Sequence, residues 1–377
     1  PYDQVFDVVS SYFYPDRYEP LSDVILRYEI GKMGNRDKEV FLLPGNFRKQ
    51  EVRGSHNWYV NAEFWNSLAA GMKQFAWFLV GDSMLDEPQW TKQLATWGQR
   101  LETLGPVVKQ MHVDQKRPVG VLLSFVDGGF GEMVSRWRWK KGPVPVFRRL
   151  LRHGIPVEFV GEDEIIRSDR LQRYRALVVW NVRYLRQGTY DAVRRWQEDG
   201  GQLLYDEGSR VVFPEVEADP VDMEALVSTL ERVVNPVVTC EPFDATCRRH
   251  HAEDADYYVI ANNYTDRFKS WAKASPALEM IKDAKSRERA KTDEPDPQAV
   301  EATLAVNSAE PLHFYDLSKA EKVPSTFDKE QERVRTRVDL PGNAGGAFLW
   351  ATPVAVEAFA LHAPDKVTRG TELSLRF

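Results

Sequence analysis

Short apolar runs recur through the first 115 residues, and each is followed by residues that end a strand. The runs are rich in β-branched and aromatic side chains, and Pro15-Asp16, Pro44-Gly45 and Gly81-Asp82 come directly after them. The pattern predicts three strands, at Val5–Tyr14, Val40–Leu43 and Phe75–Val80.

Helical periodicity fills part of the space between these strands. Residues 58–73 repeat apolar positions at steps of three and four, and so does the segment from Trp90 to Val108. The second segment follows Asp86-Glu87-Pro88, a typical helix start. Apolar strands separated by helices indicate a parallel sheet, because both faces of its strands are covered.

Residues 116–210 repeat strand, helix, strand more regularly. This rhythm predicts a flavodoxin-like doubly wound sheet. The expected strands are 118–125, 156–160, 175–180 and 202–205, and the expected helices are 144–153 and 187–199.

The pattern changes at about Asn235, where short strands alternate with Pro-Gly and Asn-Ala-Gly-Gly turns. Such spacing is typical of an antiparallel β-sandwich. The expected strands are 237–241, 257–262, 312–316, 333–340 and 347–351. Between Arg267 and Val300 lie eight Lys or Arg and six Asp or Glu with few large apolar residues, which indicates a solvated insertion.

Composition narrows the function classes. The chain has 377 residues, 43% of them apolar, which fits two or three globular domains. Its net charge of -6 argues against a chain-wide affinity for nucleic acid or anionic lipid. No apolar run approaches the roughly 18 residues of a membrane helix. We therefore expect neither nucleic acid nor a membrane as a partner.

The N-terminus has neither an initiator Met nor a basic and then apolar signal region, so we expect the sequence to begin inside a longer protein. Two cysteines in the whole chain exclude a disulfide-rich scaffold. They leave the compartment, cytoplasmic or exported, undecided.

The order of these segments resembles the C-terminal portion of a family 42 β-galactosidase. VSSYFYPD, VFLLPGNF, WYVNAEFWNSLAAGMK and FAWFLVGD resemble the last strands and helices of its TIM barrel. RPVGVLLSF, LLRHGIPVEFV, RALVVWNVRYL and RRWQEDGGQLLYDEG look like its glutamine-amidotransferase-like trimerisation domain, and YYVIANNYTD and HFYDL are similar to its closing β-domain.

The resemblance implies a mixed α/β chain of three parts. Residues 1–115 would be the end of a TIM barrel, 116–232 the trimerisation-type domain and 233–377 a β-sandwich. It also implies a glycoside hydrolase with a carbohydrate substrate, completed by a preceding barrel segment or a companion chain. A homo-oligomer, with a trimer as one form, is expected.

Catalysis is the point at which the sequence departs from the family. The family's general acid follows the fourth barrel strand, which would precede Pro1, and its nucleophilic Glu ends the seventh strand, where this chain has Pro44 or Gly45. Retaining glycosidases need two carboxylates about 5–5.5 Å apart. The carboxylates near predicted strand ends are Asp16, Glu51, Asp82, Asp86 and Glu87.

We take Asp82 as the first catalytic candidate and Asp16 as the second, because the carboxyl ends of barrel strands form the active-site face. Helix capping is the other interpretation for Asp82, and it is the preferred one for Asp86 and Glu87.

A sugar subsite is predicted in the same loops. Aromatic rings offer an apolar face and a polar edge to a pyranose. The candidates are Tyr14, Asn46, His56 and Trp58. Core packing is the alternative for Trp58 and the preferred role of Trp65, Trp90 and Trp97.

Residues 116–232 lack the cysteine nucleophile that a glutamine amidotransferase needs. No Cys occurs between residues 116 and 239, which excludes a thiolate glutaminase and favours packing or oligomerisation. Asp206-Glu207-Gly208 keeps the position of a site after a strand. The glycines at 128–131 lack phosphate-loop spacing, so no cofactor is expected. Cations alternate with aromatics at 136–141, which fits a solvated loop or an acidic-sugar site.

Cys240 and Cys247 would face each other across a hairpin if Phe243-Asp244 formed a two-residue loop. A disulfide and two free thiols both fit this arrangement. His250 and His251 make a poor metal site, because adjacent strand residues point to opposite faces, and no metal is expected.

The sequence thus favours part of a glycoside hydrolase-like protein that cleaves or binds glycosides. A non-catalytic carbohydrate-binding or scaffold protein, or an oligomerisation module without sugar contact, is the rival interpretation.

Overall fold

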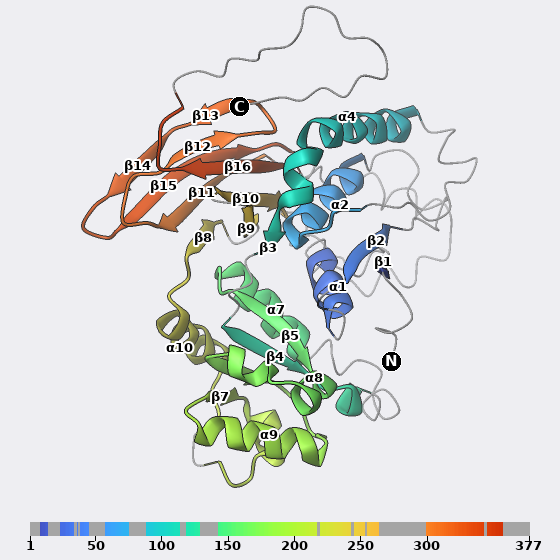
Figure 1. Ribbon diagram of the computed structural model, residues 1–377, viewed down its shortest axis with the longest axis vertical. Helices are drawn as coiled ribbons and strands as arrows, with labels where there is room; N and C mark the ends of the chain where they lie inside the picture. The colour runs from blue at the N-terminus through green and yellow to red at the C-terminus, as the bar shows by residue number, and fades with distance from the viewer. Residues whose placement is uncertain are drawn as a thin grey trace, which may run out of the picture.

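The computed structural model combines parallel and antiparallel sheets (Figure 1). It describes residues 8–13, 23–33, 36, 38–44, 57–74, 88–113, 118–128, 142–216, 219–242, 245–252, 255–263, 299–342 and 345–356. Within these ranges no helix is both long enough and apolar enough to cross a membrane.

A parallel pair of strands opens the chain. β1 (Val8–Phe13) lies beside β2 (Glu39–Pro44), and α1 (Asp23–Lys32) connects them. The predicted strands and their parallel arrangement are confirmed for this pair, whereas α1 was not predicted. The strand expected at 75–80 lies outside the described residues.

Two further helices follow, as their periodicity predicted. α2 (Asn57–Ala70) packs against α4 (Pro88–Gln110). Phe64 stacks on Trp97 at 4.5 Å between ring centroids, and Trp65 meets Trp97 edge-on at 5.2 Å. Trp65 and Trp97 are buried, so their predicted core role is confirmed. The side chain of Trp90 is not among those described.

The second unit is a four-stranded parallel sheet in the order β5-β4-β6-β7. By position along the chain this order is 2-1-3-4, the start of the flavodoxin-like doubly wound order. Its strands are β4 (Val119–Leu123), β5 (Val157–Gly161), β6 (Ala176–Val179) and β7 (Gln202–Tyr205).

Helices cover both faces of this sheet, which explains why its strands are apolar on both sides. α7 (Pro143–Arg152) and α10 (Met223–Val234) pack on one face, and α9 (Gln187–Glu198) packs on the other. The shorter elements are α8 (Glu162–Arg167), η2 (Arg170–Arg173) and η3 (Glu207–Val212).

Two antiparallel sheets complete the molecule, at the upper left of Figure 1. One has the order β13-β12-β16-β10-β9-β3 and the other the order β14-β15-β11-β8. The strands are β3 (His112–Val113), β8 (Val238–Glu241), β9 (Ala245–Ala252), β10 (Ala255–Asn262), β11 (Val300–Asn307), β12 (His313–Asp316), β13 (Glu321–Val323), β14 (Ser325–Asp328), β15 (Arg333–Leu340) and β16 (Gly346–Thr352).

Both faces of the six-stranded sheet are buried. One face and the four-stranded sheet enclose a core that includes Tyr258, Leu304 and Leu349. The other face presents Phe348 and Val259 to a core shared with α2. At Gly346 a Cβ would lie 2.4 Å from the Trp65 ring, so only glycine permits this close approach of sheet to helix.

Candidate functional site

The residues predicted to form the sugar site fall almost entirely outside the described part of the chain. This holds for the predicted residues Tyr14, Asp16, Asn46, His56 and Asp82, and for the other carboxylates Glu51, Asp86 and Glu87. Trp58 lies in the first turn of α2, where the backbone alone is described. The catalytic and subsite assignments therefore stay predictions.

The strands that precede these residues are described. β1 ends one residue before Tyr14, and β2 ends two residues before Asn46. The two strands are adjacent and parallel, so their carboxyl ends lie at one edge. In a TIM barrel that edge carries the active site.

Polar side chains gather at the carboxyl edge of the four-stranded sheet. The Ser124 hydroxyl, directly after β4, donates to Glu162 Oε1 at 2.6 Å. Glu162, directly after β5, is 1% exposed, and its Oε2 accepts from the Arg186 backbone N–H at 3.0 Å and from the Thr189 hydroxyl at 3.1 Å. This carboxylate ties the loops after β4, β5 and β6 together.

Two aspartates extend this arrangement. Asp127 Oδ1 accepts from the backbone N–H groups of Arg183 and Tyr184 at 2.8 and 3.2 Å. Asp206 Oδ1 accepts from the Asn181 N–H at 2.8 Å and from the N–H and hydroxyl of Ser209 at 3.1 and 2.6 Å. Asp206, which the sequence placed at a site-like position, therefore fixes the loop after β6 and starts η3.

The carboxyl edge of the four-stranded sheet includes the topological switch point between β4 and β6, the place where open α/β sheets usually bind ligands. Its carboxylates accept backbone and hydroxyl hydrogen bonds that lock neighbouring loops together. Phe125 and Tyr184, from the two loops that flank the switch point, are each 48% exposed. The arrangement suits a rigid surface for packing or binding.

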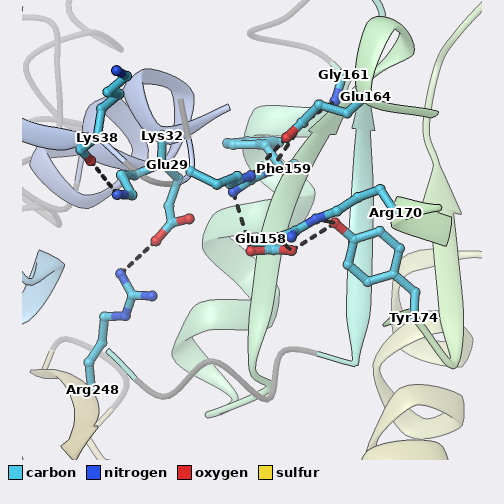
Figure 2. A network of polar contacts seen from close by, with 11 residues as sticks. Glu29, Lys32, Lys38, Glu158, Phe159, Gly161, Glu164, Arg170, Tyr174 and Arg248 are labelled. Atoms are coloured by element: carbon cyan, nitrogen blue, oxygen red, sulfur yellow. Dashed lines mark hydrogen bonds and ion pairs between the residues drawn. The ribbon is translucent and has the colours of Figure 1, made fainter. Parts of the chain in front are cut away.

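A second polar cluster joins the first unit to the doubly wound unit (Figure 2). Arg36, in the turn between α1 and β2, reaches Glu164 Oε1 at 2.8 Å and Glu158 Oε2 at 3.2 Å, and it donates to the Phe159 carbonyl. Arg170 and the Tyr174 hydroxyl both donate to Glu158 Oε1, the latter at 2.7 Å. We call these residues the junction cluster.

Burial explains the junction cluster. The Glu158 side chain is 8% exposed on a strand whose other residues are apolar, so its charge needs partners. Burial, together with the nearby Glu158 carboxylate, raises the pKa of the Tyr174 phenol above its ordinary value, so the phenol keeps its proton and donates. An acidic residue within the apolar run PVEFV was the sequence signal for this cluster.

α1 is also tied to the six-stranded sheet. Arg248 Nη1 on β9 lies 3.0 Å from Glu29 Oε1, and the two side chains are 7% and 0% exposed. Figure 2 shows Glu29 and Arg248 to the left of Glu158 and Tyr174 of the junction cluster. The first unit is thus tied to both of the other units through charged side chains, by Glu29 on α1 and by Arg36 in the turn after it.

The cysteines correct one prediction. Cys240 on β8 pairs with Leu304 of β11, and Cys247 on β9 pairs with Ile260 of β10, so the two do not oppose each other in one hairpin ladder. β8 and β9 belong to separate sheets because β8 pairs with β11 and β9 pairs with β10. Both thiols are free and buried. Burial raises the pKa of Cys240 to about 12.

The histidines behave as strand alternation predicted. His250 is fully buried, whereas the His251 side chain is 55% exposed and lies 3.0 Å from Asp256. Within the described ranges, no group of three or more His, Cys, Asp or Glu is arranged to hold a metal ion. The segments 136–141 and 267–298 lie outside those ranges, and so do the glycines at 129–131.

Comparison with known proteins supplies fold relatives only. No family model and no curated protein sequence matches the chain. A GH42 β-galactosidase from G. stearothermophilus, solved as a catalytic mutant, aligns with a TM-score of 0.64 at 11% identity over 93% of this chain and 60% of that one. An apo exo-carrageenase GH42 from Bacteroides ovatus aligns at 0.59 and 11% identity, over 88% and 44%. The α-L-fucosidase isoenzyme 2 from Paenibacillus thiaminolyticus aligns with a TM-score of 0.59 at 11% identity, over 90% of this chain and 63% of that one.

This chain therefore spans 44–63% of the length of these structures. Identity of 11% carries no residue-level conclusion. The shared feature is the arrangement of the backbone, and on that ground the chain has a glycoside hydrolase-like fold.

Proposed function

We propose that this chain is the C-terminal part of a glycoside hydrolase-like protein, and that it acts on glycosides together with a preceding barrel segment or companion chain. The observation that supports this most is the extent of the fold similarity. An alignment over 93% of the chain leaves out only 7%. It therefore includes most of each of the ranges 1–115, 116–232 and 233–377.

The parallel pair β1 and β2 supports the assignment of residues 1–115 to the end of a TIM barrel. A strand, helix, strand unit is the repeating element of that barrel. Its carboxyl edge precedes Tyr14, Asp16 and Asn46 in the sequence. In this proposal Asp82 does acid/base work, with Asp16 as second candidate, and Trp58 and His56 line the sugar subsite.

The test joins this chain to its barrel segment and measures hydrolysis of p-nitrophenyl β-galactoside and α-L-fucoside. If Asp82 transfers a proton, Asp82→Asn lowers kcat by about 10² to 10⁴ and leaves the melting temperature unchanged. Asp86→Asn is the matched control, because its expected role is capping. An unchanged kcat with a lower melting temperature would assign Asp82 to a helix cap instead.

The rival function, oligomerisation or scaffolding, is favoured by a specific surface. Four large apolar side chains are 42–65% exposed, one in the segment after each strand of the four-stranded sheet. They are Ile166, Phe125, Tyr184 and Val211. A contiguous patch of exposed apolar residues is typical of a protein interface, and under this rival proposal the four side chains form such a patch.

Light scattering of the full chain tests this rival. Tyr184→Ser should dissociate an oligomer that uses this edge, whereas Val354→Ser, which alters an apolar residue 70% exposed elsewhere, should leave the mass unchanged. A monomeric parent chain, or an oligomer indifferent to Tyr184→Ser, rejects this surface as the interface.

A further inference from the structure

The two cysteines flank a sharp corner where the chain passes from one sheet of the sandwich to the other. β8 ends at Glu241, and β9 starts at Ala245 in the facing sheet. The Ala245 N–H donates to the Pro242 carbonyl at 2.9 Å, which closes the turn. Counting two residues outward from each end of this turn gives Cys240 and Cys247.

Both thiols lie inside the same core. Cys240 is 5% exposed and Cys247 is 8% exposed, and both belong to the apolar cluster between the two sheets. Burial raises the pKa of Cys247, and the Cys240 thiolate, when it forms, contributes to the same rise. The turn thus places two inward-facing thiols at equivalent distances along strands that leave it in separate sheets.

We infer that Cys240 and Cys247 are a latent redox pair that closes into one disulfide between the two sheets of the sandwich. The oxidant is a low-molecular-weight disulfide such as glutathione disulfide. One cysteine thiolate attacks it, forms a mixed disulfide and releases one glutathione. The second cysteine then attacks the protein sulfur and releases the other. Two electrons pass to the oxidant, and the two protons leave with the released thiols.

Access to the thiols depends on β8. It is the edge strand of the four-stranded sheet and pairs with β11 over four residues only, Val238 to Glu241. Short edge strands detach at lower free energy than central ones. Opening of β8 uncovers Cys240 first, because Cys247 lies on β9, which pairs with β10 over eight residues, Ala245 to Ala252. We therefore expect oxidation to start at Cys240 and to be slow in the closed sandwich.

The test incubates the full chain with glutathione disulfide in urea below the global unfolding transition, then removes urea and measures intact mass. The expected product is lighter by two hydrogens, has no free thiol after denaturation, and yields a peptide that links Cys240 to Cys247. Its melting temperature is higher than that of the reduced chain, and a reductant reverses the rise, because the bond restricts the unfolded state.

Cys240→Ser and Cys247→Ser are the matched controls. Each should gain a single glutathione or none, with no rise in melting temperature, and circular dichroism checks that each is folded. Wild-type chain that keeps both thiols, carries glutathione without an internal bond, or links to a second chain would overturn the inference. These outcomes are independent of the proposed function, since none of them requires glycoside hydrolysis.

Discussion

Removing Arg248 from its contact with Glu29 should destabilise the protein far more than removing a surface ion pair. The two side chains are 7% and 0% exposed, with 3.0 Å between Nη1 and Oε1. Arg248→Met leaves the Glu29 carboxylate buried without this cation. Breaking a buried pair in this way costs about 3–5 kcal/mol, whereas exposed pairs contribute about 0–1 kcal/mol.

The assay is urea unfolding followed by tryptophan fluorescence, to which the buried Trp65 and Trp97 contribute. Arg337→Met is the matched control, because its partner Glu301 lies 3.8 Å away and the two side chains are 75% and 57% exposed. We expect a change of at most about 1 kcal/mol there.

A double variant isolates the pair itself. Glu29→Leu combined with Arg248→Met replaces both charges by apolar groups, so its loss should fall short of the summed single losses by about 2 kcal/mol or more. A loss below about 1 kcal/mol for Arg248→Met, or additive single losses, would refute the view that burial makes this contact strong.

Four further substitutions test other parts of the structure. Glu158→Gln removes the carboxylate from the junction cluster and should cost about 3–5 kcal/mol in the same urea assay; a cost under 1 kcal/mol contradicts a buried role. Gly98→Ala on α4, where a new Cβ meets nothing within 4 Å, should stabilise by about 0.5–1 kcal/mol, whereas Gly154→Ala, with φ +68 and a Cβ 2.0 Å from the Val238 carbonyl oxygen, should reduce the melting temperature sharply. The thiol of Cys240 ionises near 9 when unfolded and has a pKa of about 12 when folded, so stability should fall by up to ~1.4 kcal/mol per pH unit across that window. Cys240→Ala should lack this share of the slope, and equal slopes in both proteins would argue against the raised pKa.

Periodicity predicted the regular elements well where one face or both faces are apolar. α4 shows a clear apolar stripe, and β4 is apolar throughout, so each follows from local sequence. α1 was missed because it is buried almost all round and carries Glu29 inside the protein. A charged residue within a helix normally indicates a solvent-exposed position, whereas Glu29 pairs inside the protein with Arg248, which is distant in the sequence.

The corner at the cysteines shows the same limit. Local sequence allowed a two-residue turn at Phe243-Asp244, and the Ala245 N–H donates to the Pro242 carbonyl. It did not predict the paths of the strands on either side, because β8 pairs with β11 and β9 pairs with β10 instead of continuing one hairpin. The local pattern of a single sequence does not indicate which distant strands pair or in which register they do so.

The position of β3 limits where this protein can be divided into fragments. His112 and Val113 begin two residues after the last residue of α4, yet they pair with His251 and His250 at the end of the six-stranded sheet. The chain therefore crosses to its C-terminal sheet before it builds the doubly wound unit. A fragment beginning at residue 116 would leave the backbone of β9 bare at this end and invite pairing with foreign strands. A fragment that is to keep the complete six-stranded sheet must therefore also include β3, which precedes the doubly wound unit in the sequence.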